Sequence, residues 1–252
     1  MWKGAAAAAA AAMADLAWFN KDGLEKFFLE KYTEEGELKA DAEPLGQGTF
    51  ACVYQAGTAG GSDGLVLRVV NARVGAAGDQ CFAKEVLAVR AFLKLRGESD
   101  VPEVGKVVML DEAKQPPGLC PIFCYLIVNE EGSGVRKIFT VMPKAIPIMT
   151  VIEGQLQAAE AGGENATRDL SQLVKWMSQV ACGMRFMHKK GVFWRDCKLD
   201  NIVLVNGDAK IIDISSGVCT VGYASHEQLV KLDLSAEAIC NNQMITDALE
   251  QA

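Results

Sequence analysis

The sequence predicts an α+β fold, and three observations support this prediction. First, bulky side chains alternate around two glycines over residues 45–54, which indicates two strands joined by a glycine-rich turn. Second, apolar side chains recur at helical spacing over residues 80–95 and again over 167–189. Third, Asn206 and Gly207 separate two runs rich in Val and Ile, which is the strongest short signal for a β-hairpin.

Composition narrows the class of protein. The 252 residues are 50% hydrophobic and 23% charged, which is enough for one large domain or for two lobes with a real core. The net charge of -7 argues against a nucleic-acid binder, because no basic stripe is present to displace counterions from phosphates. The negative net charge does not exclude a local pocket for an anionic ligand. No run of 18 apolar residues occurs, so we expect no membrane span.

Cysteine usage and the first residues bear on the compartment. The eight cysteines follow no repeating pattern, and Cys120 and Cys124 lack a second Cys or His pair at zinc-like spacing. We expect reduced, partly buried thiols in a cytoplasmic protein. Two histidines leave little room for a histidine-based triad or metal site. Residues 1–14 faintly imitate a signal peptide, but the alanine run favours a low-complexity helical extension.

A short helix is expected after this extension. Asp22 and Glu25 have the spacing of a capping box, which makes Asp22 the predicted N-cap. Phe27 and Phe28 share one helical face, and Gly36 is the expected end of the element. We expect this helix to dock its phenylalanine pair on the domain that follows.

Residues 65–70 form an expected strand in which Arg68 is the single charge. Arg68 either lies at an exposed edge or points into a ligand cleft. The helix expected over residues 80–95 carries Glu85 among its apolar positions. An ion pair between Arg68 and Glu85 is one interpretation, and two separate surface charges are the other.

The middle of the chain continues with strands and then a long helix. Further strands are expected at residues 101–110, 122–128 and 138–142, followed by a rigid connector between Pro143 and Pro147 and a loop at 158–166. Thr167 is the expected cap of a helix that runs to Lys189. Its predicted buried stripe comprises Leu170, Leu173, Trp176, Met177, Val180, Met184 and Met187.

The stretch from Trp194 to Asn201 concentrates two acids, an amide and two cations ahead of an apolar strand. The hairpin after it returns the chain so that Asp213 lies beside Asn201. Mg²⁺ prefers carboxylate or amide oxygens together with phosphate oxygens, which these two residues can supply. A metal-phosphate site is therefore one interpretation, and a charged surface loop is the other.

In this order the parts resemble the eukaryotic protein kinase domain, over about residues 39–233. Residues 45–54 look like the glycine-rich loop, with Ala51 in place of the third glycine. Arg68 stands where the ATP-binding lysine is expected, and Glu85 stands where its helix partner is expected. Residues 141–145 look like the hinge, with Met142 as gatekeeper. Residues 194–201 match the catalytic loop, and residues 213–215 stand for Asp-Phe-Gly.

The resemblance implies a bilobal fold. Its N-terminal lobe is an antiparallel sheet with one main helix, expected at residues 39–142 after an extension at 1–38. Its C-terminal lobe is mainly helical and is expected to be incomplete, with the hinge and a partial lobe at residues 143–252. Residues 222–227 look like a remnant of the Ala-Pro-Glu segment, and the chain stops at Ala252.

The resemblance also assigns roles to residues. Asp196 would accept the proton of the substrate hydroxyl and orient it, and Lys198 would steady the transferring phosphoryl group. Asn201 and Asp213 would hold Mg²⁺. The residues expected to bind ATP are Gly46, Gly48, Val53, Arg68, Glu85 and Met142.

Besides the early remnant at residues 222–227, three departures from the kinase pattern keep the activity open. Arg68 is bulkier and more forked than a lysine, Trp194 replaces a histidine and cannot accept a hydrogen bond, and Ser215 replaces a glycine. The first hypothesis is an active kinase that phosphorylates protein Ser/Thr hydroxyls. The second is a pseudokinase, a nucleotide-binding or scaffolding module with a regulatory protein partner. The third is a phosphotransferase acting on small molecules.

Overall fold

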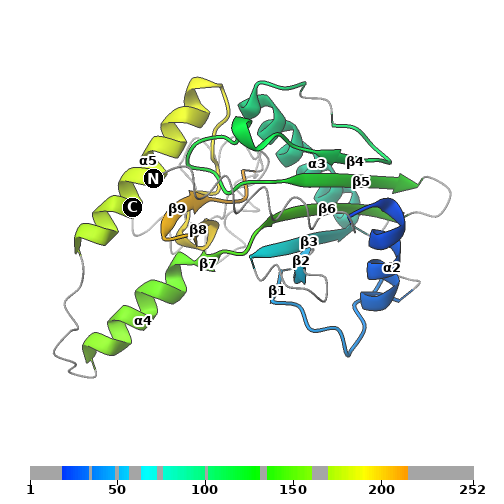
Figure 1. Cartoon of the computed structure of the whole chain (residues 1–252), viewed down its shortest axis with the longest axis horizontal. Helices are drawn as coiled ribbons and strands as arrows, with labels where there is room; N and C mark the ends of the chain where they lie inside the picture. The colour runs from blue at the N-terminus through cyan, green and yellow to red at the C-terminus, as the bar shows by residue number, and fades with distance from the viewer. Residues whose placement is uncertain are drawn as a thin grey trace, which may run out of the picture.

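A computed structural model of the chain describes residues 19–33, 36–48, 51–56, 64–72, 76–99, 102–130, 135–160 and 170–214. The expected α+β fold with two lobes is confirmed: a sheet-rich lobe comes first in the chain, and a lobe containing two long helices and a small sheet follows (Figure 1). Within these ranges no helix combines the length and apolar character needed to cross a bilayer.

The N-terminal lobe is built on a six-stranded antiparallel sheet of order β1-β2-β3-β6-β5-β4. Its strands are β1 Gly46–Gln47, β2 Ala51–Ala56, β3 Leu65–Ala72, β4 Val107–Met109, β5 Cys124–Glu130 and β6 Val135–Pro143. A 3-10 turn at Glu112–Lys114 follows β4. The strand predicted over residues 101–110 is thus much shorter than expected, whereas the other predicted strands of this lobe are present.

Strand β3 is buried on both faces of the sheet, which explains its nearly continuous apolar sequence. Leu67 and Val69 belong to a core cluster beneath helix α2, which spans Lys21–Lys31. Val70 belongs to the other cluster, which contains helix α3, Ala76–Arg96. Because side chains alternate along a strand, Arg68 points to the same side as Val70, towards α3.

Helix α2 docks its aromatic face on the sheet as expected. Phe28 is buried, and its ring lies edge-on to Phe139 of β6 with centroids 6.4 Å apart. The predicted N-cap was wrong, because Asn20 caps the helix through a 2.7 Å hydrogen bond from the Gly23 amide to its Oδ1. Asp22 lies in the first turn instead, where its charge favours the positive end of the helix dipole.

The described part of the C-terminal lobe contains two long helices and a small antiparallel sheet of order β7-β8-β9. Its elements are β7 Ile146–Pro147, α4 Ile148–Glu160, α5 Leu170–Lys189, a 3-10 turn at Leu199–Asn201, β8 Ile202–Val205 and β9 Asp208–Ile211. The predicted hairpin is confirmed: Asn206 and Gly207 have φ values of 52° and 81°, as a two-residue turn with positive φ at both positions requires.

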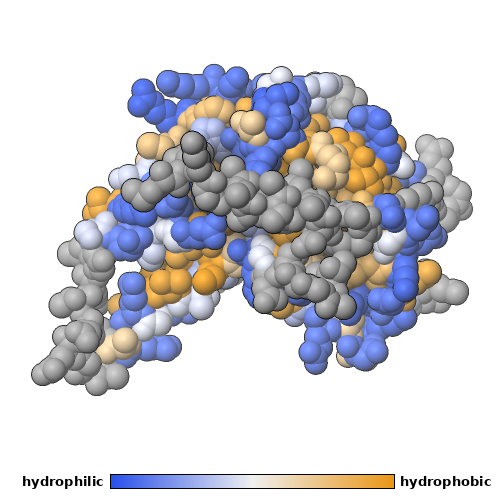
Figure 2. Space-filling view, in the orientation of Figure 1, coloured by the Kyte–Doolittle hydropathy of each residue, from blue (hydrophilic) through white to orange (hydrophobic). Residues whose placement is uncertain are grey.

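Two features of this lobe differ from the prediction. Helix α4 was not expected, and it begins directly after Pro147, at Ile148. On α5 the stripe was wrong in part, since Leu173 and Met177 are 37% and 38% exposed, whereas Trp176, Val180 and Met187 are buried. Figure 2 shows apolar surface over the beginning of α4, among mostly hydrophilic residues.

Helix α5 holds the hairpin through polar and backbone contacts. Trp176 Nε1 donates to the Gly207 carbonyl at 3.1 Å, and the Gln179 side chain bonds both Asp208 Oδ1 and the Ala209 amide, at 2.7 and 2.8 Å. Gly183 of α5 packs directly on Gly118, in the segment between β4 and β5: a Cβ on Gly118 would lie 2.5 Å from the Gly183 Cα. Helix α5 is thereby packed against both the hairpin and the segment between β4 and β5.

Several predicted features lie outside the described residues. They are the alanine-rich start, Thr167, Ser215 and the segment at 222–227. The loop predicted at 158–166 was wrong at its start, because α4 runs to Glu160, and its remainder also lies outside the described residues.

Candidate functional site

The polar residues of the stretch that follows α5 form a compact network. Asp196 and Asn201 are 8% and 7% exposed. The Asn201 amide Nδ2 donates to the Asp196 carbonyl at 2.9 Å and to Asp196 Oδ2 at 2.8 Å, and Lys198 Nζ lies 3.0 Å from the same Oδ2. A buried carboxylate is costly unless it is paired and hydrogen-bonded. The stretch is therefore not a solvated surface loop: it holds one carboxylate in a fixed orientation.

Asp213 reaches this network through the hairpin. The Ile212 amide donates to the Asn201 carbonyl at 3.0 Å, which joins the two segments side by side. Asp213 itself has φ of 51°, a left-handed conformation that few non-glycine residues adopt. Trp194 Nε1 donates to the Asp213 carbonyl at 3.2 Å. The Trp194 side chain cannot accept a hydrogen bond, as its residue type predicts, but in the structure it acts as a donor.

Arg68 and Glu85 form the ion pair that the sequence left open. Nη1 of Arg68 lies 2.8 Å from Oε2 of Glu85, and Nη2 lies 2.7 Å from Oε1, so the contact is bidentate. The two side chains keep only 26% and 21% of their exposure. Burial alone would lower the pKa of Arg68, but the charge and hydrogen bonds of Glu85, with a contribution from Asp213, raise this pKa above its usual value. Arg68 therefore stays charged inside the site.

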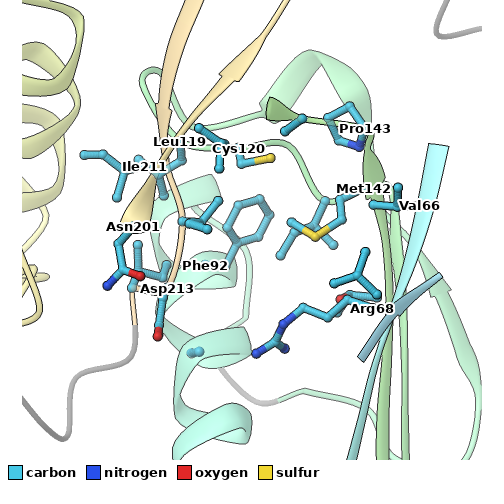
Figure 3. Close-up of a pocket in the computed structure, with 18 of the residues that line it drawn as sticks. Val66, Arg68, Phe92, Leu119, Cys120, Met142, Pro143, Asn201, Ile211 and Asp213 are labelled. Atoms are coloured by element: carbon cyan, nitrogen blue, oxygen red, sulfur yellow. The ribbon is translucent and has the colours of Figure 1, made fainter. Parts of the chain in front are cut away.

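Arg68, Glu85, Asn201 and Asp213 line one pocket of about 550 Å³, within the size range of small-molecule sites. Figure 3 shows Asn201 and Asp213 on one side of it, with Arg68 on the opposite side and Phe92 between. Most of the remaining lining is apolar. These residues include Leu45, Val53, Val66, Ala88, Val89, Leu119, Ile138, Met142, Ala145, Val203, Ile211, Ile212 and Ile214.

The structure therefore brings together seven of the predicted site residues around this pocket, namely Gly46, Val53, Arg68, Glu85, Met142, Asn201 and Asp213. Gly48, Asp196 and Lys198 are not among the residues that line it. Gly48 is exposed, and its amide donates to the Ala51 carbonyl at 2.8 Å, closing the turn. Asp196 and Lys198 reach the site through Asn201.

The glycine at the edge of the pocket has open space around it. Among the described residues, no atom apart from those of its chain neighbours lies within 4 Å of the position that a Cβ on Gly46 would take. Packing within the protein therefore does not require a glycine at this position. A ligand approaching the backbone would be the physical reason for it.

Some lining residues were missed from the sequence. Phe92 follows Glu85 by two helical turns, so the spacing along α3 could have placed it on the same face. No helix or strand pattern in the sequence marks Leu119 and Cys120 as pocket residues, because they lie in an irregular segment. Cys120 is a buried free thiol, and this burial raises its pKa to about 12.

The donor set fits a magnesium ion. Asn201 and Asp213 offer an amide oxygen and a carboxylate in the same pocket, and Asn201 directs its nitrogen to Asp196. Mg²⁺ is usually bound by one or two protein carboxylates with waters and substrate phosphates, rather than by an all-protein cage. Across the described ranges, no group of three or more His, Cys, Asp or Glu side chains is placed to hold a metal by itself.

Comparison of the sequence with known proteins shows similarity to one protein family. Residues 136–235 match the family described as the protein kinase domain. The chain is 38% identical over 52 residues to protein kinase C delta type of Mus musculus, a segment covering 20% of this chain and 7% of that protein. It is 32% identical over 75 residues to G protein-coupled receptor kinase 2 of Drosophila melanogaster, which covers 28% of this chain and 10% of that protein.

The similar segments thus span a tenth or less of these relatives' length. The family match covers nearly all of β6, the stretch at residues 194–201 and Asp213. The pocket also takes lining residues from β1, β2, β3 and α3, which precede the matched residues. Over residues 136–235 the chain is therefore similar to protein kinase domains.

Proposed function

We propose that this domain is an ATP-dependent protein kinase that transfers the γ-phosphate of ATP to a Ser or Thr hydroxyl of a protein. The observation that carries the proposal is the convergence of two polar clusters on one pocket. The Arg68–Glu85 pair lines one part of it, and Asn201 and Asp213 line another, next to the buried Asp196. Such a site can bind a nucleotide between apolar surfaces and position its phosphates.

In this proposal the residues act by positioning and electrostatics. Asp196 accepts the hydrogen bond of the substrate hydroxyl, and its carboxylate is oriented for this by Lys198 and Asn201. Lys198 also stabilises negative charge on the transferring phosphoryl group. Asn201 and Asp213 are the residues that would hold Mg²⁺, which supplies charge neutralisation at the phosphates when bound.

The adenine end of the nucleotide would lie between Val53, Val66 and Met142, which line the apolar part of the pocket. Lys144 donates its amide to the Gly64 carbonyl at 2.7 Å, which fixes the connector beside this end. Gly46 and Gly48 would let the β1–β2 turn approach the phosphates. The partner is a protein substrate or a regulatory protein.

We place this activity in the cytoplasm. The six cysteines of the described residues, Cys52, Cys81, Cys120, Cys124, Cys182 and Cys197, are all free thiols. Free thiols persist in the reducing cytosol, whereas secreted proteins form disulfides.

A second candidate function has its own observation. Both terminal nitrogens of Arg68 face Glu85, whereas the lysine of active kinases is a point charge that can turn towards the phosphates. This arrangement favours a pseudokinase, which binds a nucleotide or a protein partner without phosphoryl transfer. The two candidates share the pocket and differ in turnover.

The test of the first function is labelling of a mixed protein substrate by γ-labelled ATP and Mg²⁺, followed by phosphoamino acid analysis. We expect label on Ser and Thr, and we expect Asp196→Asn to reduce the rate by at least about 100-fold. Asp200→Asn is the matched control, because it removes an exposed carboxylate from the same turn. Label that survives Asp196→Asn would point to a contaminating kinase and would contradict the proposal.

The test that separates the second function is a thermal-shift titration with ATP, with and without Mg²⁺. A pseudokinase that binds nucleotide raises its melting temperature with ATP but labels no substrate, even after Arg68→Lys. A chain that shows no shift at millimolar ATP binds no nucleotide, which would overturn the kinase and the nucleotide-binding pseudokinase alike.

A further inference from the structure

A second cavity, of about 310 Å³, lies beside α5. Its lining comes from one face of that helix, from the end of β9 and from Gly118 in the segment between β4 and β5. None of the residues that line it also lines the main pocket. Its volume is at the lower end of the range for small-molecule sites, so it can take only a small ligand.

The side chains of this cavity are rich in hydrogen-bond donors. Lys175 and Lys210 contribute ammonium groups and Ser178 contributes a hydroxyl, whereas no carboxylate is among the lining residues that the structure describes. A ligand that accepts hydrogen bonds and carries negative charge is the chemical match for such a lining.

The two lysines differ in their partners. Lys175 Nζ lies 3.1 Å from Oδ1 of Asp208, and the Gln179 amide donates to the same oxygen at 2.7 Å. The hydrogen bonds from Gln179 and Lys175 hold the pKa of Asp208 below its usual value, so the charge of Lys175 is compensated. Lys210 makes no ion pair within the part of the chain that the structure describes. Lys210 is therefore the cation available to a ligand in this cavity.

The second cavity and the main pocket share two backbone segments. Gly118 lines the second cavity, and the next two residues, Leu119 and Cys120, line the main pocket. On β9, Lys210 lines the second cavity and Ile211 lines the main pocket. The Ile211 amide donates to the Gly118 carbonyl at 2.9 Å, and its carbonyl accepts from the Cys120 amide at 2.9 Å. Figure 3 shows Leu119, Cys120 and Ile211 together on one wall of the main pocket.

Helix α5 also contacts this shared wall. Cys182 lines the second cavity, and a Cβ on the next residue, Gly183, would lie 3.2 Å from Cδ1 of Ile211. Ile211 is 1% exposed, so its side chain is enclosed between the helix and the main pocket. Because packed interiors have few voids, a ligand that fixes Lys210 also restricts the adjoining Ile211.

We propose that the second cavity is a regulatory site for a small anion with phosphate or carboxylate groups, which is held by Lys210 and the hydroxyl of Ser178. Its occupation fixes the wall that it shares with the main pocket and so raises the affinity of that pocket for ATP, because less ordering remains to be done when ATP binds. The coupling rests on the proposed function, since it takes ATP as the ligand of the main pocket. Binding of the anion does not.

The first arm of the test uses Cys182 as a reporter of occupancy, because it is an exposed free thiol on the wall of the cavity. The full chain is alkylated with iodoacetamide, a neutral reagent, in the presence of inorganic phosphate, of succinate or of potassium chloride at matched ionic strength. At ten times its dissociation constant, a bound probe should slow alkylation of Cys182 about tenfold relative to chloride. Cys197, an exposed thiol that lines neither cavity, should keep its rate. Comparison of the two probes distinguishes a phosphate ligand from a dicarboxylate.

Three variants show whether the protection comes from this cavity. Lys210→Gln removes the available charge and should weaken binding of the probe about tenfold. Ser178→Leu fills the cavity from the exposed side of α5 without a change of charge, and it should also reduce the protection. Lys26→Gln, at an exposed lysine of α2, is the matched control and should change nothing. Protection that is equal in Lys210→Gln and in the unsubstituted chain overturns the proposal, and so does an absence of protection by both probes.

The second arm measures the affinity for ATP and Mg²⁺ by thermal shift, with and without the probe that protects Cys182. We expect affinity about fivefold higher with the probe in the unsubstituted chain and no such gain in Lys210→Gln. A probe that leaves the affinity unchanged, or lowers it equally in both chains by competing in the main pocket, overturns the regulatory role. If ATP causes no shift while the probe still protects Cys182, the anion site stands, but the nucleotide function and the coupling both fail.

Discussion

Arg68 and Glu85 meet fork to fork, with two parallel hydrogen bonds of 2.7 and 2.8 Å between the guanidinium and the carboxylate. The pair joins β3 to α3, two elements separated by a segment outside the described residues. Because the contact is bidentate, it fixes the orientation of both planes and not only the distance between two charges. A lysine at position 68 would make one such bond at most in this direction.

The first prediction concerns this pair. Arg68→Lys should lower the free energy of unfolding by about 1 kcal/mol, because one hydrogen bond to a largely buried carboxylate is lost. Glu85→Gln should cost a similar amount. In a double-mutant cycle measured by urea denaturation, we expect a coupling of about 1–2 kcal/mol. Additive effects of the two substitutions would show that the ion pair contributes nothing to stability.

The second prediction concerns the contact between Gly118 and Gly183. Gly118→Ala places a Cβ 2.5 Å from the Gly183 Cα at a residue with φ of 79°, so it combines overpacking with backbone strain. We expect a loss of about 3 kcal/mol in urea denaturation. Gly105→Ala is the control, because Gly105 has φ of 81° and nothing within 4 Å of the added Cβ. It should cost only about 1 kcal/mol, and an equal cost for both would refute the packing argument.

The third prediction concerns helix α2. The Phe28 ring stacks on Tyr32 with centroids 4.3 Å apart, and Lys137 Nζ lies 3.2 Å from its centre. Phe28→Ala should therefore cost about 3–4 kcal/mol in the free energy of unfolding. Leu29→Ala, on the exposed side of the same helix at 53% exposure, should change it by less than about 0.5 kcal/mol. A small effect of Phe28→Ala would mean that α2 is not part of the cooperative unit.

The fourth prediction concerns the pH dependence of thiol alkylation. Burial raises the pKa of Cys120 and of Cys124 to about 12, which keeps these thiols neutral near pH 8. Burial, with the nearby Asp196 charge, also raises the pKa of Cys197, although this residue is exposed. Because the thiolate is the reactive form, raised pKa values shift modification to higher pH.

We therefore expect iodoacetamide at pH 8 to modify Cys197 slowly and to leave Cys120 and Cys124 unmodified in the folded protein. The rate at Cys197 should keep rising above pH 8.5, where an ordinary thiol levels off at about its pKa. Mass spectrometry of peptides after isotopic alkylation gives the rate for each cysteine. Modification of Cys120 as fast as Cys197 at pH 8 would contradict the burial of its thiol.

Local signals account for the parts of the site that were predicted. The turn at Asn206–Gly207 requires positive φ at two successive residues, which few dipeptides other than Asn-Gly adopt readily. The hairpin that it forms brings the Ile212 amide to the Asn201 carbonyl, so one short signal predicted a pairing between segments eleven positions apart. Arg68 was harder to place. Whether Arg68 lies at an exposed edge or in the cleft depends on which face of β3 packs against α3. Tertiary packing determines that face.

Tertiary contacts explain what the sequence did not reveal. Helix α4 follows Pro147 and carries the β-branched run at 150–152, which disfavours helix, but its first residue Ile148 is completely buried in the core. Leu119 enters the pocket through a parallel bridge to Ile211, a pairing between segments far apart in the chain. The donor role of Trp194 depends on the return of the hairpin, so it too could not be derived from its own segment.

The contact at Gly118 also has a mechanical consequence. The segment after β4 exchanges two backbone hydrogen bonds with β9, from the Ile211 amide to the Gly118 carbonyl and from the Cys120 amide to the Ile211 carbonyl, both 2.9 Å. Together with the covalent connector between β6 and β7, this attaches the two lobes at two separate points. Two lobes attached at two points can still rotate relative to each other about the line that joins these points. We therefore expect the cleft to open and close by a hinge rotation about this line. In that rotation Arg68 and Glu85 would move together relative to Asp213.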